Sequence, residues 1–479
     1  MANAYDLVIV GAGSAGYAAA RTAGALGARV ALIDKGPLGG LCILRGCMPS
    51  KAILASAEVL HRAQHARSLG LVIPEARADL PAIIARKRHL VREFADYRVE
   101  QIHRAPNTEL FEGEARFVDA HHVEILAGPT GATRARQVIE GRAFILAAGS
   151  NVTLPELPGL PEAGYLTSDE ALELEQAPGS LIVLGGGFIA CELGQFFARI
   201  GVKVTMLLRS GHVLSGEDAD VGISLQEALA KEGVEIVNHA VWTEVVARSG
   251  RKVVRALVGG HPAEFEADQI LVCTGRHPAL DQLGLEAAGV EHTMRQIPVD
   301  PFMRTSVPHI YAAGDVTGRF QIVHQAIREA ELAAYNAASG KAARAIDDRL
   351  VPVVVFTDPQ VGRVGLTEGQ AAERGIEVLV GKYPFDDHGK SMCLGRTEGF
   401  VKLIGDARTG EILGGAIVGP EGGELLHEIV VAMHFKATAA EFLQIPHVHP
   451  TLAEILTYPA EEIEEQRQQA GAQAVDLRS

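Results

Sequence analysis

The segment LVIVGAGSAG (Leu7–Gly16) joins a short aliphatic run to three glycines at the spacing GxGxxG. The run predicts a buried β-strand, and an Ala-rich helix follows it as far as Leu26. Gly11 allows a tight turn, Gly13 lets the backbone approach a pyrophosphate, and Gly16 allows the helix to pack closely on the strand. The helix N-terminus supplies N–H donors for phosphates. The segment therefore predicts a dinucleotide-binding α/β unit.

A second copy of this unit follows 174 residues later, at Leu181–Ile189. In the first copy a strand leads to Asp34, whose carboxylate can accept hydrogen bonds from a ribose diol. Leu208 takes the position of Asp34 in the second copy. One GxGxxG match is weak evidence because isolated matches are frequent. Two copies in register indicate two dinucleotide sites.

Two thiols follow the first unit, in GGLCILRGCMPSK (Gly39–Lys51). Cys42 and Cys47 can close a small disulfide if the backbone brings them together. Their spacing is not the CxxC of a zinc site, and no second Cys or His pair lies nearby to complete one. A thiol pair cannot accept a hydride directly, whereas a flavin can take a hydride and pass two electrons to a disulfide. We therefore expect FAD in the first unit and the nicotinamide coenzyme in the second.

The thiol segment resembles the redox-active segment GGxCxxxGCxPSK of the class I pyridine nucleotide-disulfide oxidoreductases, and it matches at every fixed position. This family includes dihydrolipoamide dehydrogenase, glutathione reductase and mercuric reductase. The resemblance extends from Leu7 to Glu454. It implies an α/β protein with two Rossmann-like dinucleotide-binding domains and a C-terminal α+β dimerisation domain. The expected boundaries are 1–152 and 277–348 for the FAD-binding domain, 153–276 for the NAD(P)-binding domain, and 349–479 for the dimerisation domain.

The resemblance also implies roles for individual side chains. Cys47 corresponds to the thiol on the flavin side and Cys42 to the thiol that exchanges with substrate. A helix beginning near Cys47 would favour its thiolate. Lys51 corresponds to a lysine near the flavin ring, with Glu192 as its partner. For the cysteines the alternative is two structural thiols, which would leave the Gly pair and the Pro-Ser-Lys unexplained. For Lys51 and Glu192 the alternative is a position on the solvated surface.

A second motif, HVHPTLAE, covers His447–Glu454. It resembles the HPTxxE segment of the family, in which a His–Glu pair exchanges protons with the interchange thiol. This implies that His449 and Glu454 form the pair. Disulfide exchange needs a thiolate to attack and a proton for the leaving sulfur, and imidazole can serve both steps. His447 matches no catalytic position, and we expect it to be structural.

The cofactor contacts implied by the motifs involve a larger set of residues. Thr305–Asp315 resembles the second FAD motif of the family, in which the aspartate binds the ribityl chain. Phe188 is either an aromatic gate over the flavin or a core aromatic. The residues expected to bind FAD are Gly11, Gly13, Ser14, Gly16, Asp34, Gly40, Lys51, Gly149 and Asp315. Those expected to bind the coenzyme are Gly185, Gly187, Phe188, Ile189, Arg209 and Gly275.

Coenzyme choice depends on the end of the second unit. NAD-preferring relatives have an acid at the position of Leu208, where it binds the 2′-hydroxyl. Leu208 cannot do this, and Arg209 beside it can bind a 2′-phosphate. The sequence therefore predicts a modest preference for NADPH.

These motifs predict an FAD-dependent disulfide oxidoreductase that resembles dihydrolipoamide dehydrogenase. One alternative is an NADPH-dependent reductase of glutathione or another small disulfide, for which Arg21 is the one candidate anion contact. Another is a non-enzymatic flavoprotein redox sensor, against which the intact His449 and Glu454 argue. Mercuric reductase is disfavoured because no C-terminal cysteine pair follows Cys393.

Composition limits the partners and the compartment. The net charge of −15 disfavours a nucleic-acid partner. No apolar run reaches the roughly 20 residues that a membrane helix needs. The N-terminus has no basic region, and the five cysteines are too few for a secreted disulfide scaffold. We therefore expect a cytoplasmic protein. The resemblance implies a homodimer that acts on a small dithiol or disulfide, with a lipoyl-carrying protein as one candidate partner.

Overall fold

The computed structural model of the chain describes residues 4–127, 137–340 and 343–476, with side chains as far as residue 470. The chain forms two compact units. The first unit consists of Met1–Ala52, Ile84–Leu154 and Gly275–Asp347, and the second of Ile53–Ile83, Pro155–Thr274 and Asp348–Ser479. Residues 53–83 belong to the second unit, although they lie inside the expected FAD-binding segment 1–152. The assignment of segments to cofactors stays a prediction.

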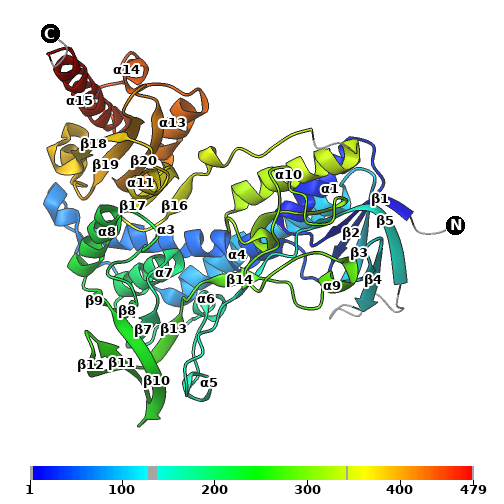
Figure 1. Cartoon of the computed structure of the whole chain (residues 1–479). Helices are drawn as coiled ribbons and strands as arrows, with labels where there is room; N and C mark the ends of the chain where they lie inside the picture. Colours follow the sequence, from blue (N-terminus) through cyan, green and yellow to red (C-terminus); the bar gives the residue numbers. More distant parts are fainter. Residues whose placement is uncertain (1–3, 128–136, 341–342, 477–479) are drawn as a thin grey trace. The chain divides into compact units, whose positions relative to one another are not determined.

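A parallel sheet forms the centre of the first unit (Figure 1). Its strands are, in spatial order, β3 (Thr108–Asp119), β2 (Val30–Asp34), β1 (Ala4–Val10), β5 (Gln137–Leu146) and β15 (Ile310–Ala312). The inner strands are almost continuous runs of aliphatic residues because both faces of the sheet are covered. β4 (His122–Ala127) pairs antiparallel with β3 and β5 and closes the sheet at one end.

Helices α1 (Ser14–Ala25) and α10 (Val323–Ser339) share one hydrophobic cluster with this sheet. Small side chains allow the close approach, because a Cβ on Gly16 would lie 1.7 Å from the carbonyl oxygen of Gly11. The other cluster of the sheet includes the short helix α9 (Leu285–Ala288). The chain leaves and re-enters the first unit through β6 (Ser150–Val152) and β14 (Arg276–Pro278), which pair antiparallel.

The second dinucleotide motif lies in the second unit, on a four-stranded parallel sheet. Its strands are, in spatial order, β13 (Gln269–Val272), β7 (Ser180–Leu184), β8 (Lys203–Leu207) and β9 (Glu235–Val237). Helices α7 (Phe188–Arg199) and α8 (Ala219–Lys231) connect its strands. A separate antiparallel sheet contains β10 (Ala240–Arg248), β11 (Arg251–Val258) and β12 (His261–Ala267).

The C-terminal part of the second unit contains a five-stranded antiparallel sheet. The spatial order is β16 (Val353–Val355), β17 (Gln360–Gly365), β20 (Ile412–Gly419), β19 (Phe400–Asp406) and β18 (Val378–Pro384). The helices of this part are α11 (Glu368–Glu373), α12 (Gly389–Leu394), α13 (Gly422–His434), α14 (Ala439–Phe442) and α15 (Thr457–Asp476). Residues of α13 and α15 share a hydrophobic cluster with the sheet.

The remaining elements are helices. They are α2 (Gly40–Leu44), α3 (Cys47–Gln64), α4 (Leu80–His103), α5 (Leu160–Ala163) and α6 (Ser168–Ala171), with short 3₁₀ helices η1 (Ala66–Leu69), η2 (Gly314–Thr317), η3 (Asp348–Leu350), η4 (Phe385–Asp387) and η5 (Ala453–Leu456). Within residues 4–127, 137–340 and 343–476, no helix has the length and apolarity needed to cross a membrane.

Candidate active site

The first glycine-rich loop connects β1 to α1 and lies against the thiol segment. Gly11 has a φ of +100°, and a Cβ there would come within 2.3 Å of the carbonyl oxygen of Ala147. A Cβ on Gly40 would lie 2.6 Å from the Cα of Gly13, so the two backbones touch. The first turn of α1 carries no acidic side chain, and its N-cap, Gly13, makes no side-chain cap. The loop and helix terminus leave backbone N–H groups available, which fits a pyrophosphate.

Asp34, which was expected to contact a ribose, accepts two hydrogen bonds from backbone N–H groups of the chain. Its Oδ2 accepts a 2.6 Å hydrogen bond from the backbone N–H of Ala12, and its Oδ1 accepts one of 2.7 Å from Gly36. The carboxylate therefore ties the end of β2 to the glycine-rich loop. The spacing of the motif indicated Asp34 as a ligand contact, but which groups the short side chain reaches depends on the packing of the loop.

The two thiols lie on consecutive helices of the first unit. Cys42 is in α2, and Cys47 is the first residue of α3. Both are free thiols and both are partly buried. The position of Cys47 at a helix N-terminus favours its thiolate, because the aligned peptide dipoles and free N–H groups attract negative charge.

The thiols interact directly. The pKa of Cys42 is raised chiefly by its hydrogen bond with the Cys47 side chain, and further by burial and by the negative charge of Cys47, while Lys51 partly offsets the effect. When one thiol loses its proton, the resulting thiolate accepts a hydrogen bond from the other thiol. This bond and the negative charge both oppose loss of the second proton. Cys42 therefore holds its proton more firmly than an ordinary thiol does.

Asp315, on η2, is part of a polar network that the motifs did not indicate in full. Ser150 Oγ donates a 2.6 Å hydrogen bond to Asp315 Oδ2, and Arg276 Nε donates to Ser150 Oγ at 2.9 Å. Burial raises the pKa of Asp315, and Ser150 and Arg276 act against this rise. The backbone N–H of Gly314 donates to Glu329 at 2.8 Å.

Sequence reasoning missed Ser150, Arg276 and Glu329. Ser150 and Arg276 each follow a predicted glycine, Gly149 or Gly275. The antiparallel pairing of the two chain crossings brings these neighbours together. The sequence carries no local signal for that pairing, so these contacts were visible only in the structure.

Lys51 lies one turn after Cys47 on α3, within the first unit. Glu192 is buried on α7 in the second unit, where its Oε1 accepts a 3.0 Å hydrogen bond from the backbone N–H of Phe356. The expected pairing of Lys51 with Glu192 stays a prediction. The bond to Phe356 shows that Glu192 also joins α7 to the segment after β16.

The second glycine-rich loop has the geometry of the first. Gly185 has a φ of +127°, and a Cβ there would lie 2.4 Å from the carbonyl oxygen of Cys273. Gly187 is the N-cap of α7, and no described atom lies within 4 Å of a Cβ added to it. Phe188 and Ile189 form the first, partly exposed residues of the helix. The loop therefore has room for a second phosphate group at a helix N-terminus.

Leu208 and Arg209 differ sharply in environment. Leu208 is fully buried, and its Cγ lies 2.8 Å from where a Cβ of Gly186 would be. Arg209 is exposed, and its guanidinium lies 5.6 Å from the ring centroid of Trp242. The aliphatic residue therefore packs beneath the loop, while the cation stays accessible beside an aromatic ring.

His449 and Glu454 form a contact in the C-terminal part of the second unit. His449 Nδ1 lies 2.9 Å from Glu454 Oε2, and 81% of the His449 side chain is exposed. Glu454 is buried on η5. His447 is held elsewhere, with Nε2 2.6 Å from Glu428 Oε1. This arrangement leaves Nε2 of His449 facing outward while the carboxylate orients the ring.

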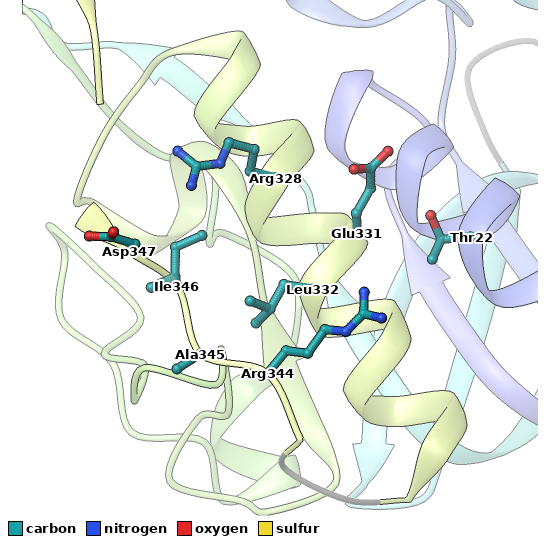
Figure 2. A pocket seen from close by; sticks show the side chains of 8 residues that line it. All are labelled: Thr22, Arg328, Glu331, Leu332, Arg344, Ala345, Ile346 and Asp347. Atoms are coloured by element: carbon teal, nitrogen blue, oxygen red, sulfur yellow. The ribbon is translucent and has the colours of Figure 1, made fainter. Parts of the chain in front are cut away.

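The first unit also contains a cavity of about 380 Å³ between α1, α10 and the segment Arg344–Asp347 (Figure 2). None of the expected site residues lines it. Near it, Arg21 forms a 2.6 Å ion pair with Glu331. Arg21 is therefore already engaged by a carboxylate of the chain, which weakens its candidacy as an anchor for glutathione.

The nucleotide loops, the thiol pair and the His–Glu contact define a flavoprotein disulfide oxidoreductase. Residues 5–330 match the family model for pyridine nucleotide-disulphide oxidoreductases, and residues 351–460 match the dimerisation domain of that family. The chain belongs to this family. Its cofactors are FAD and NAD(P)H, and it carries the domain through which the family forms homodimers.

The relatives of this chain have different substrates. It is 36% identical over 458 residues to a dihydrolipoyl dehydrogenase of Geobacillus stearothermophilus, covering 95% of each chain. It is also 36% identical over 451 residues to a mercuric reductase of Bacillus cereus, covering 94% of this chain but 70% of the relative. Among solved structures, LpdA from Mycobacterium tuberculosis is similar with a TM-score of 0.84 at 28% identity, covering 95% of this chain and 98% of that one. The Cu(II) complex of the HOCl-induced flavoprotein disulfide reductase RclA from Escherichia coli has a TM-score of 0.83 at 28% identity, with coverage of 96% and 99%.

Proposed function

We propose that this chain is a dihydrolipoyl dehydrogenase-like enzyme that passes electrons from a small dithiol to NAD(P)⁺ through FAD and the Cys42–Cys47 pair. The observation that carries the proposal is the mutual hydrogen bonding of the two thiols at the start of α3, beside the Gly13–Gly40 contact. Two interacting thiols beside a dinucleotide loop support a disulfide that can form and exchange there. The relative named as a dihydrolipoyl dehydrogenase also aligns over nearly the full length of both chains.

The chemistry balances as two thiol–disulfide exchanges. A substrate thiol gives its proton to His449 Nε2, and its sulfur attacks Cys42 Sγ of the oxidised pair. A bond forms between the substrate sulfur and Cys42, and Cys47 leaves as a thiolate. The second substrate thiol loses its proton to solvent and attacks the first substrate sulfur, and Cys42 leaves and takes the proton from His449. The substrate is oxidised by two electrons, and the enzyme disulfide is reduced.

Bound FAD supplies the step that the protein cannot, since it takes two electrons from the reduced thiols and delivers a hydride to NAD(P)⁺. The residues expected to hold FAD are those of the Gly11–Gly16 loop, Gly40, Lys51, Gly149 and Asp315. We expect Cys47, at the helix N-terminus, to be the thiolate next to the flavin. The pKa of Cys42 is raised, first by its hydrogen bond with Cys47, so a base must remove the Cys42 proton. His449, oriented by Glu454, is the base that we assign.

Two alternatives to this function are a reductase of another small disulfide and a redox sensor without turnover. An NADPH-dependent reductase of a small disulfide is favoured by buried Leu208 and exposed Arg209. Oxidised glutathione is less favoured because Arg21 pairs with Glu331. A redox sensor without turnover would have no use for a His449–Glu454 pair with an exposed imidazole.

Steady-state turnover of the purified FAD-loaded protein tests the proposal. The panel contains dihydrolipoamide with NAD⁺ or NADP⁺, and lipoamide, oxidised glutathione and other small disulfides with NADH or NADPH. We expect the highest kcat/KM with the dihydrolipoamide–lipoamide couple. Turnover confined to oxidised glutathione would select the reductase of a small disulfide. No turnover of any member, with coenzyme oxidation by ferricyanide intact, would support the sensor.

The partner and compartment follow from this proposal. A lipoyl group attached to a carrier protein presents the required dithiol, so we infer a lipoyl-carrying protein as the partner. A reduced thiol pair that cycles during turnover belongs in a reducing compartment, which supports a cytoplasmic location.

A further inference from the structure

The buried side of Glu454 faces a second histidine that no motif indicated. His388 is 1% exposed and lies between η4 and α12. Its Nε2 is 3.4 Å from Glu454 Oε1, whereas Glu454 Oε2 is 2.9 Å from His449 Nδ1. The carboxylate is therefore placed between two imidazoles, one buried and one mostly exposed.

The other nitrogen of His388 is fixed by Ser391, which is fully buried. Ser391 Oγ lies 2.9 Å from His388 Nδ1. If the hydroxyl donates to Nδ1, the neutral ring carries its proton on Nε2, and that N–H faces the carboxylate. The opposite tautomer would aim a lone pair at a carboxylate oxygen, which is electrostatically unfavourable. Ser391 thus selects the tautomer that supports Glu454.

Nε2 of His388 has no hydrogen bond of good geometry within the described part of the chain. An unsatisfied buried N–H is costly, and a small rotation of the Glu454 carboxylate would satisfy it. The ionisable groups around the ring are Glu454 on η5, His449 before it and Tyr458 on α15, whose ring lies edge-on at 6.4 Å. Tyr383 of β18 stacks on Tyr458, and the ring of Phe385 packs edge-on against His388. The ring is thus enclosed by aromatic groups on its remaining sides.

We propose that His388 is a positioning residue, which donates its Nε2–H to Glu454 and so holds the carboxylate against His449. This inference rests on the proposed function, in which His449 moves the proton of disulfide exchange. Burial lowers the pKa of His388, with Glu454 acting in the opposite direction and His449 in the same one. The ring therefore stays neutral at pH 7, so it orients Glu454 without adding a charge that would compete with His449.

The test uses the FAD-loaded full-length protein and two readouts. Deuterium exchange at C2 of each imidazole, followed by peptide mass spectrometry across a pH series, gives the pH at which His449 is half protonated, and it needs no substrate. The pH profile of kcat for lipoamide turnover is the second readout. His388→Phe keeps a ring but removes both nitrogens. We expect the protonation midpoint of His449 to fall and kcat to drop by about tenfold, because the carboxylate is free to turn away from the imidazolium.

Three further variants separate positioning from general disruption. His388→Gln can place an N–H near Glu454 and should recover most of the loss. Ser391→Ala removes the hydroxyl that selects the tautomer, so it should lower the protonation midpoint of His449 and kcat by smaller amounts. If His388→Phe does not retain FAD, Ser391→Ala replaces it as the test variant. In a Glu454→Gln background, His388→Phe should have no further effect on the protonation of His449, because the carboxylate through which His388 acts is absent.

The matched control is His447→Phe, which removes a buried histidine that contacts another glutamate, Glu428, in the same domain. It should leave the protonation midpoint of His449 unchanged. An unchanged midpoint in His388→Phe, an equal shift in His447→Phe, or a shift that persists with Glu454→Gln would each overturn the proposal. These outcomes are distinct from failure of the proposed function, which would show as absent disulfide turnover in the unmodified protein.

Discussion

At the residue scale, the two thiols are chemically unequal although they lie only four residues apart in the sequence. Cys47 begins a helix, whereas Cys42 has a raised pKa, first because of its hydrogen bond with the Cys47 side chain and then because of burial. The difference comes from where α3 begins. It supports the prediction that Cys47 lies on the flavin side and that Cys42 exchanges with substrate.

This assignment predicts opposite spectra for two variants. Two-electron reduction of the FAD-loaded protein should produce a long-wavelength charge-transfer band between the Cys47 thiolate and oxidised flavin. Cys47→Ser should abolish the band, and Cys42→Ser should show it without any reductant, because Cys47 then has no partner for a disulfide. Absorbance spectra of the purified variants measure this. A band that survives in Cys47→Ser would reverse the assignment of the two sulfurs.

Arg209 carries the prediction on coenzyme choice. Its exposed guanidinium can bind a 2′-phosphate bidentately, whereas buried Leu208 offers nothing to a 2′-hydroxyl. We expect Arg209→Ala to lower kcat/KM for NADPH by about tenfold and to leave NADH nearly unchanged. Arg248→Ala, which removes an exposed arginine of β10, is the control. A large preference for NADH that Arg209→Ala does not alter would contradict the prediction.

At the element scale, ion pairs join α7 to the segment after β16 within the second unit. Arg199 Nη2 lies 3.0 Å from Asp358 Oδ2, and Arg396 Nη2 lies 2.9 Å from Oδ1. Glu232, which follows α8, also holds Arg199 at 2.6 Å. The nearby bond from Phe356 to Glu192 shows that the same junction positions a candidate site residue.

This junction predicts a dependence of stability on pH. Burial alone would raise the pKa of Asp358, but Arg199 and Arg396 outweigh it, so the pKa is lowered. A carboxylate with a lowered folded-state pKa stabilises the fold above its unfolded value of about 3.9, and this contribution is lost as the pH falls through the folded-state value. Asp358→Asn should therefore lower the free energy of unfolding by about 2 kcal/mol at pH 6.

The difference between Asp358→Asn and the unmodified protein should narrow as the pH falls from 5 toward 3, because the unmodified protein then loses the same charge. Thermal unfolding at a series of pH values measures it. Asp386→Asn changes an exposed aspartate and is the control. A difference in stability that stays constant down to pH 3 would show that the Asp358 charge is not responsible.

At the scale of the whole molecule, His449 and the thiols belong to different units of the chain. The dimerisation domain of the family covers residues 351–460, which include His449 and Glu454. We predict that a two-fold axis puts each His449 into the site of the other subunit. The exposure of His449 in a single chain is in line with this prediction.

Hybrid dimers test the prediction. Neither Cys47→Ser nor His449→Ala homodimers should turn over disulfide appreciably. Random remixing of equal amounts makes half of the dimers hybrids, each with one doubly damaged site and one intact site, so roughly a quarter of all sites should recover. Two different affinity tags verify the remixing. Verified hybrids without recovered turnover would mean that His449 acts in its own chain or has no catalytic role.

Much of the local structure follows from the sequence alone. Glycines at the spacing GxGxxG, after an aliphatic run, specify a tight turn that most other residues cannot adopt, so both dinucleotide units and their order were predictable. These signals are short-range, because backbone dihedral preferences and side-chain periodicity act within a few residues.

Other features depend on contacts between distant residues. Asp34 was placed correctly after its strand, yet its bonds to Ala12 and Gly36 follow from how the loop folds back. Ser150 and Arg276 contact each other because β6 pairs with β14. His388 lies close to Glu454, 66 residues later in the chain, because η4 and η5 belong to one packed domain. The sequence alone determined which chemical groups are present and which backbone turns are allowed. Only the tertiary structure decided which groups share a hydrogen bond, since that depends on packing between segments that have no local signal for each other.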